Sequence, residues 1–165
     1  MNFPWKPHQL VGHWVPGFVV LTTLLLADAH AHHAMALWSK ITGSLGSNFA
    51  VILAIIIPFV IGEFLDCLRD LGEHLADKIS EIKWDKLKSL SVEKQAVFED
   101  YYFVYYVFNM NLSIGLIAGY LLTLIIRLFP TDYGCPFTLA VLFGVLVFFI
   151  NACSLRVEIK KFLDN

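Results

Sequence analysis

The chain has 165 residues, of which 58% are hydrophobic and only 16% are charged, and its mean hydropathy is +0.67. A formal net charge of -2 without a basic stripe excludes an electrostatic surface for nucleic acid. The composition is typical of an integral membrane protein, because a helix needs roughly 20 mostly apolar residues to cross the ~30 Å hydrocarbon layer of a bilayer.

Four long apolar stretches predict four transmembrane helices. In chain order, the expected spans cover residues 12–31, 49–68, 104–129 and 136–153. The stretches are continuous rather than alternating, which favours helices over the strands of a membrane barrel. Lipid offers no partner to backbone N–H and C=O groups, and a helix satisfies these groups internally. Too few residues remain for a soluble domain, so we expect one all-α domain that is a four-helix transmembrane bundle.

The distribution of positive charge predicts the orientation of this bundle. Most lysines and arginines lie between spans two and three and after residue 153, whereas the other two connections have only Lys40 and, at the edge of span three, Arg127. By the positive-inside rule, both termini and residues 69–103 are expected in the cytoplasm. Apolar residues recur at helical spacing from Phe64 to Ile82, so helices two and three should extend into the cytoplasm as a helical hairpin. The expected location is the inner, or plasma, membrane of a bacterium.

The connection after the first span carries a cluster of titratable side chains, which consists of Asp28, His30, His32 and His33. This cluster could bind zinc or sense external acidity, since histidine titrates near pH 6.5. A simple polar loop is the interpretation that we favour. By the charge rule His8 and His13 lie on the other side of the membrane, so one diiron centre cannot use both groups of histidines.

Polar side chains from all four spans are expected at one depth, near the cytoplasmic face of the bundle. They are His13, Glu63, Asp66, Asn109, Asn111 and Asn151. A charged side chain within a bilayer costs about 2.5 kcal/mol or more, so such residues usually face the bundle interior and mark function. The alternative is a set of interhelical hydrogen bonds, worth roughly 0.6 to 2 kcal/mol each, that fix the bundle. For Glu63 we favour the functional interpretation.

One face of the second helix is acidic. Glu63, Asp66, Asp70, His74 and Asp77 recur at steps of three and four residues. Side chains at this spacing can ligate a cation from one helix, which makes the first four of them metal-ligand candidates. No Glu-x-x-His step is present, however, so we expect a solvated face from Asp70 to Asp77, with no bound metal or cofactor.

Small residues on the last two spans predict close helix packing. Gly115 and Gly119 form a GxxxG pair, and Gly144 lies on one face of span four. Small residues at this spacing let two helix backbones approach closely. The contact could be internal to one protomer or could join two subunits, and we expect a homo-oligomer.

The sequence contains no nucleotide-binding loop, no nucleophile motif and no convincing metal-binding box, so its catalytic residues are unknown. We therefore expect a non-enzymatic, oligomeric membrane protein that responds to a cytoplasmic signal or protein partner and alters membrane permeability. It would act as a channel or as an effector, as in bacterial defence. Two alternatives stay open: an intramembrane enzyme with a His/Glu/Asp site at the inner leaflet, or a proton or cation transporter with Glu63 as carrier.

Overall fold

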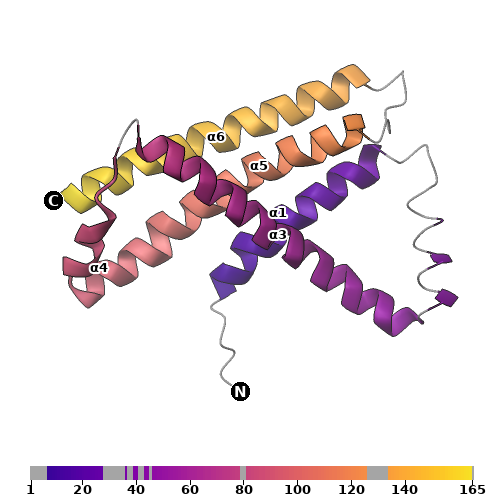
Figure 1. Cartoon of the computed structure of the whole chain (residues 1–165), viewed down its shortest axis with the longest axis horizontal. Helices are drawn as coiled ribbons and strands as arrows, with labels where there is room; N and C mark the ends of the chain where they lie inside the picture. The colour runs from indigo at the N-terminus through magenta and orange to yellow at the C-terminus, as the bar shows by residue number, and fades with distance from the viewer. Residues whose placement is uncertain are drawn as a thin grey trace.

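The computed structural model describes residues 7–27, 36, 39–40, 43–44, 46–78, 81–125 and 134–164. The order of its elements is α1 (Pro7–Ala27), α3 (Ser47–Asp77), the 3-10 helix η1 (Trp84–Ser89), α4 (Val92–Val97), the π-helical turn η2 (Phe98–Phe103), α5 (Val104–Ile125) and α6 (Gly134–Asp164). These parts of the chain contain helices and no strand, which confirms the predicted all-α fold (Figure 1).

In the part of the chain that the structure describes, three helical segments are long and apolar enough to cross a membrane: Asn48–Asp77, Val92–Ile125 and Cys135–Asp164. The apolar part of α1, Val11–Leu24, is shorter than these segments. The expected ends of the first and third spans, at residues 31 and 129, lie outside the described residues. The cluster of Asp28, His30, His32 and His33 also lies outside them.

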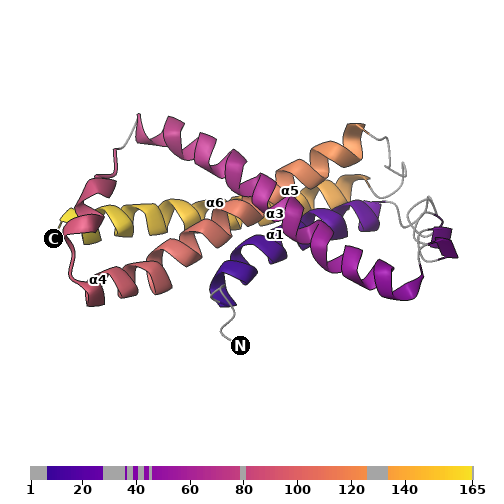
Figure 2. The ribbon, with the colours of Figure 1, turned by 60° about the horizontal axis from the view of Figure 1, so that its bottom comes forward.

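Helix α1 lies at the centre of the fold, because it packs against both α3 and α5, and α5 packs in turn against α6 (Figure 1). Helix α3 crosses the others at a steep angle, so that its first half lies apart from α5 and α6 (Figure 2). At the crossing with α1, a Cβ atom on Gly17 would lie 1.8 Å from the carbonyl oxygen of Pro58. One on Gly62 would lie 1.9 Å from the carbonyl oxygen of His13, so the two helix backbones touch directly.

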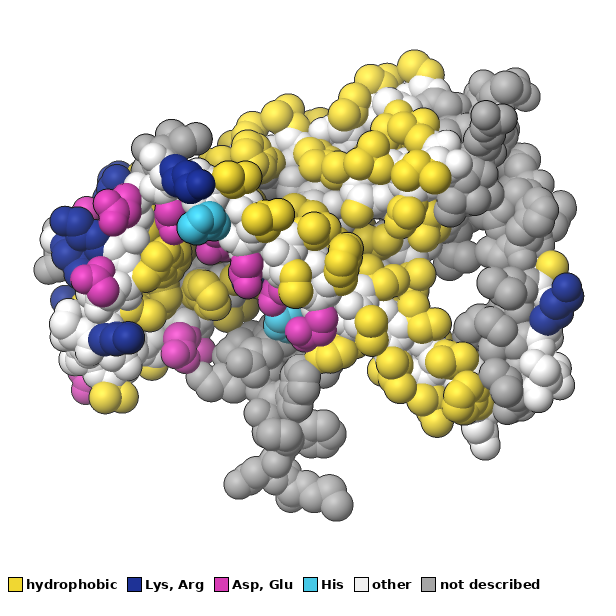
Figure 3. Space-filling model, in the orientation of Figure 1, with side chains coloured by type: hydrophobic (Ala, Val, Ile, Leu, Met, Phe, Trp, Pro, Cys, Tyr) yellow, Lys and Arg dark blue, Asp and Glu magenta, His cyan; other side chains and the backbone are white. Residues whose placement is uncertain are grey.

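The outer surface of the long helices is apolar. On α3 the exposed side chains include Phe49, Val51, Ile52, Ile55, Ile56 and Val60, and on α6 they include Leu142, Phe143, Leu146, Phe149 and Ile150. Figure 3 shows hydrophobic side chains over much of this face, with most charged side chains at the end where α4 and the C-terminus lie and further acidic and histidine side chains toward the middle of the molecule. Apolar exposure on this scale marks contact with a membrane or another protein.

The charged end of the molecule has a hydrophobic core of its own. Ile82, Phe98, Tyr106 and Ile159 are buried together there. The Lys86 ammonium donates a hydrogen bond of 2.8 Å to Asp164, and this bond lowers the pKa of the Asp164 carboxyl group. The segment that was expected to form a helical hairpin, residues 69–103, thus includes a 3-10 helix that is bonded through Lys86 to the last turn of α6.

Candidate functional site

Part of the charged face of α3 points toward the other helices. Arg69 is buried, with 6% of its surface exposed, whereas Phe64 and Leu71 on the opposite face are 63% and 62% exposed. The sequence predicted a solvated face from Asp70 to Asp77, and this expectation is wrong for part of it. Asp70 and His74 are exposed, but Asp77 is half-buried against the other helices.

Arg69 is the centre of an ionic network within α3. Its Nη1 atom lies 2.5 Å from Asp66 Oδ1, its Nη2 atom 2.7 Å from Asp70 Oδ1, and its Nε atom 3.1 Å from Glu73 Oε1. The rigid guanidinium fork has donors for all three carboxylates. A buried charge is stable only when it is paired, so Arg69 keeps these acids compatible with the helix interface.

Asp66 connects this network to α1 and α5. Its Oδ1 atom accepts a 2.7 Å hydrogen bond from Asn111 Nδ2, which also donates to the carbonyl oxygen of Gly12 at 3.3 Å. On the side of α1, His13 Nδ1 lies 3.2 Å from Asp66 Oδ2 and 3.6 Å from Glu63 Oε1. One carboxylate therefore joins three helices. We define the ionic network as His13, Glu63, Asp66, Arg69, Asp70, Glu73, Asp77, Tyr106, Asn111 and Arg156.

The last members of the network connect α6 to α3. The Arg156 guanidinium pairs with Asp77, and its Nη1 atom donates to the Tyr106 hydroxyl at 3.5 Å. Asp77 also accepts a 3.3 Å hydrogen bond from the Trp84 indole. Since Trp84 belongs to η1, the connecting segment contacts the network through Asp77.

Several polar atoms of the network are buried without a well-formed hydrogen bond. They are His13 Nδ1, Arg69 Nε, Glu73 Oε1 and Asn111 Oδ1. The first three lie close to an oppositely charged or polar partner, but the angles are poor for hydrogen bonding. A buried group left unsatisfied costs about 1–3 kcal/mol. For Arg69 Nε and Glu73 Oε1 this cost is reduced, because the two groups are oppositely charged and these atoms lie 3.1 Å apart.

Two of the predicted polar residues form a separate pair. Asn151 Nδ2 on α6 donates to Asn109 Oδ1 at 2.9 Å, and Asn109 Nδ2 donates to the carbonyl oxygen of Tyr105 at 2.7 Å. The structure thus brings together four of the six predicted side chains, His13, Glu63, Asp66 and Asn111. Asn109 and Asn151 instead form a hydrogen bond between α5 and α6, of the kind that the alternative interpretation of the polar residues expects.

The metal-ligand candidates occupy a different environment from the one that a metal site requires. Among the described residues, no group of three or more His, Cys, Asp or Glu side chains is arranged to hold a metal ion. The Arg69 guanidinium pairs with Asp66 and Asp70, while Glu63 is half-exposed and His74 is exposed. The negative charge of Asp66 and Asp70 is therefore balanced by the guanidinium group of Arg69.

The glycines of the predicted packing motif contact neighbours within the protomer. A Cβ atom on Gly115 would lie 3.3 Å from the Pro16 carbonyl oxygen, and one on Gly119 would lie 3.0 Å from Thr23 Cβ. One on Gly144 would lie 2.9 Å from a methyl group of Leu116. The faces of α5 and α6 that carry these glycines are occupied inside one chain.

Sequence reasoning missed four members of the network: Arg69, Glu73, Tyr106 and Arg156. The spacing of Arg69 and Glu73, four residues apart, is a helical ion-pair signal that could have found them. Tyr106 and Arg156 carry no such signal, since they meet only through the packing of α5 on α6.

No family model, curated protein or solved structure matches this chain. The fold and the site alone define the class: the described residues form an all-helical fold, with three helices long and apolar enough to span a membrane and an ionic network between helices.

Proposed function

We propose that this protein lies in a bacterial plasma membrane with four spans and both termini in the cytoplasm, and that it alters membrane permeability to protons or small cations. The observation that carries the proposal is the ionic network, in which Asp66 contacts His13 and Asn111 where α1, α3 and α5 meet. His13, Glu63 and Asp66 lie inside the proposed spans, and ionisable side chains within a membrane usually mark ion pathways or proton relays.

The charge of the network favours cations over anions. Two guanidinium groups, from Arg69 and Arg156, face five carboxylates. The carboxylates belong to Glu63, Asp66, Asp70, Glu73 and Asp77. The excess of negative charge can be relieved by protonation of His13 or of a carboxylate, or by entry of a cation. Acidic linings are also the usual basis of cation selectivity in channels.

The contacts of the network suggest how a cytoplasmic signal or protein partner would control it. Arg156 ties α6 to α3 through Asp77, and Asp77 also contacts Trp84 of the connecting segment. A partner that displaces η1 would therefore disturb the Arg156–Asp77 pair. Release of this pair would let α3 move relative to α6, which is the proposed opening step.

The exposed apolar faces of α3 and α6 leave room for lipid and for further subunits of a homo-oligomer. The glycines on α5 are not available for that contact, because α1 covers them. We therefore propose that subunits meet through other faces, and that the assembly acts as a channel or effector.

Ion flux into liposomes tests the proposal. The full chain is reconstituted with a trapped pH-sensitive dye, and proton or potassium gradients are followed for wild type, Arg156→Gln and Asp66→Asn. We expect Arg156→Gln to raise the ion flux because it releases α6 from Asp77. In the double variant Arg156→Gln/Asp66→Asn, the flux should be at least about tenfold lower than in Arg156→Gln alone. Asp85→Asn removes an exposed carboxylate of η1 and is the matched control, with no expected change. If neither wild type nor Arg156→Gln exceeds protein-free liposomes, the proposal is wrong.

Thiol labelling tests the orientation. In a background in which Cys67, Cys135 and Cys153 are replaced by serine, a cysteine at position 43 should react with an impermeant maleimide in intact cells. One at position 86 should react only after permeabilisation. The reverse pattern would place the ionic network at the outer leaflet.

One observation favours the intramembrane enzyme as a second candidate. His13 lies 3.2 Å from Asp66, an arrangement in which a carboxylate orients an imidazole base. An enzyme would convert a lipid or membrane peptide in liposomes whose ion gradients stay intact, and His13→Gln would abolish that conversion.

A further inference from the structure

A groove lined by tyrosines lies between α6 and the segment where η2 leads into α5. Its volume is about 460 Å³, and its lining consists of Val97, Tyr101, Tyr102, Tyr105, Leu155 and Glu158. Tyr101 and Tyr105 are 69% and 53% exposed. Tyr102 packs on Phe162 of α6 with ring centroids 5.2 Å apart, which fixes one wall.

We propose that this groove binds the ammonium headgroup of a zwitterionic phospholipid. The faces of aromatic rings attract cations, and aromatic-lined sites recognise quaternary ammonium groups. Glu158 adds a carboxylate to the lining, and it makes no ion pair with another described residue. Val97 and Leu155 supply apolar surface for the methylene groups of the ligand.

The position of the groove along the helices fits a headgroup rather than an acyl chain. Helix α5 begins at Val104, between Tyr102 and Tyr105 of the groove, and its apolar part follows; Glu158 comes after the apolar part of α6. The groove therefore lies where apolar and charged parts of the molecule meet, which is the level at which tyrosine is enriched in membrane proteins. This inference depends on the membrane location of the proposed function but not on ion permeation.

The backbone at the groove is also unusual. The six residues Phe98–Phe103 form a π-helical turn that contains Tyr101 and Tyr102. Such turns are rare, and they occur frequently at functional sites. The π-helical turn is a feature of the backbone, and the groove is a feature of the side chains. Both are found at Tyr101 and Tyr102.

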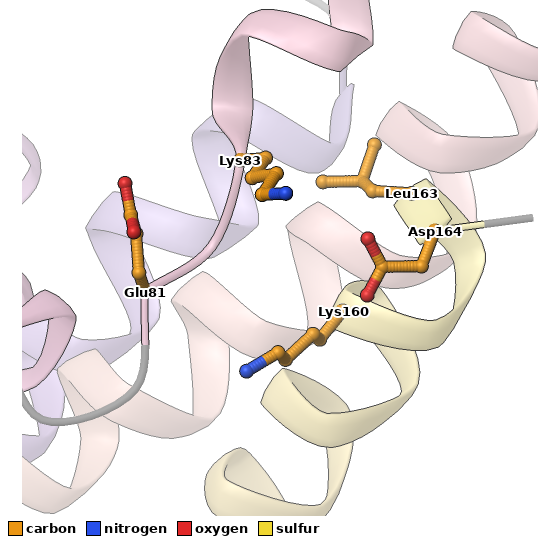
Figure 4. Close-up of a pocket in the computed structure, with 5 residues that line it drawn as sticks. All are labelled: Glu81, Lys83, Lys160, Leu163 and Asp164. Carbon is orange, nitrogen blue, oxygen red and sulfur yellow. The ribbon is translucent and has the colours of Figure 1, made fainter.

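A second cavity, of about 290 Å³, differs from the tyrosine-lined groove in the charge of its lining. Its lining contains Lys83 and Lys160 together with Glu81 and Asp164 (Figure 4). Figure 4 shows both lysines and the Asp164 carboxylate around one space, so positive and negative groups oppose each other there. In the tyrosine-lined groove the single charge is the carboxylate of Glu158, which favours a cationic ligand.

Native mass spectrometry of the full chain tests the proposal. The protein is purified in detergent and equilibrated with equal amounts of phosphatidylethanolamine, phosphatidylcholine and phosphatidylglycerol, all with the same acyl chains. We expect wild type to retain the two ammonium lipids about fivefold or more over phosphatidylglycerol. Glu158→Gln and the double variant Tyr101→Leu/Tyr105→Leu should lose this preference. The double variant Tyr101→Phe/Tyr105→Phe should keep it, because the rings remain.

Glu93→Gln is the matched control, since it removes an exposed carboxylate of α4 that does not line the groove. Equal retention of the three lipids by wild type, or an unchanged preference in both Glu158→Gln and the leucine variant, would overturn the proposal. Full displacement of the lipids by millimolar choline and ethanolamine would also overturn it, because the ligand would then be a soluble ammonium compound. Extraction of the protein from membranes by alkaline carbonate would instead contradict the membrane location, on which both proposals depend.

Discussion

Substitution of Gly62 by alanine tests the backbone contact between α1 and α3. The new Cβ would lie 1.9 Å from the carbonyl oxygen of His13 and 2.5 Å from its carbonyl carbon. Both atoms belong to a helix backbone and cannot rotate away, so the helices must separate by about 1.5 Å to reach ordinary contact distance. Overpacking typically costs about 1–3 kcal/mol, and we expect a loss of about 3 kcal/mol here.

Gly72 is the matched control because it lies on the same helix and a Cβ there would meet nothing within 4 Å. Alanine is favoured over glycine in a helix by about 1 kcal/mol, so Gly72→Ala should stabilise the protein. The free energy of unfolding is measured by circular dichroism during titration of mixed micelles with a denaturing detergent. The two variants should differ by about 4 kcal/mol.

The separation of α1 from α3 should also affect the ionic network. His13 belongs to the contact itself, so its distances to Glu63 and Asp66 should lengthen in Gly62→Ala. Equal stability of Gly62→Ala and Gly72→Ala would refute the reasoning, since it would mean that the two backbones do not touch at this crossing.

Three further variants test other parts of the fold. Arg69→Leu should lower the free energy of unfolding by about 3–5 kcal/mol in the same titration, because it leaves buried carboxylates unpaired, whereas exposed Lys88→Gln should have little effect. The hydrogen bond from Lys86 lowers the pKa of Asp164 below its unfolded value of 3.8, so its stabilising effect is complete above that value and is lost as the pH falls through the lowered pKa. Asp164→Asn should therefore melt below wild type at neutral pH, and the two melting temperatures should converge in strong acid; a constant difference at all pH values would contradict this. Gly119→Leu should destabilise the protomer without changing the oligomer mass measured by light scattering, because its side chain would enter the contact with α1; a discrete smaller assembly would assign Gly119 to a subunit interface.

The helices of this protein could be predicted because their signals are local. Continuous apolar runs of about 20 residues indicate helices wherever they occur in the chain. The sequence therefore predicted an all-α protein, and α3, α5 and α6 contain the expected apolar segments. The irregular helices around residues 84–103 were not predicted, because their shape depends on packing against the end of α6.

The candidate site was predicted in part. Matching the depths of polar residues on each span brought His13, Glu63, Asp66 and Asn111 to one level, and the structure places them in contact or close to it. The same reasoning included Asn109 and Asn151, which pair elsewhere. Depth along a helix follows from residue number, but the direction in which a side chain points also depends on how each helix is rotated against its neighbours.

The sequence by itself determined that the chain is helical and that its long apolar segments match the thickness of a bilayer, because both properties follow from local hydrophobicity and length. Only the tertiary structure decided which face of α3 is enclosed. In water an apolar stripe turns inward, but beside lipid the apolar stripe can face outward while charged groups pair inside. Phe64 and Leu71 are exposed and Arg69 is buried, so on this part of α3 the apolar stripe faces outward and the charged groups pair inside. A periodic pattern of charged and apolar residues is identical in the two cases, and only the packing of α1 and α5 against α3 distinguishes them.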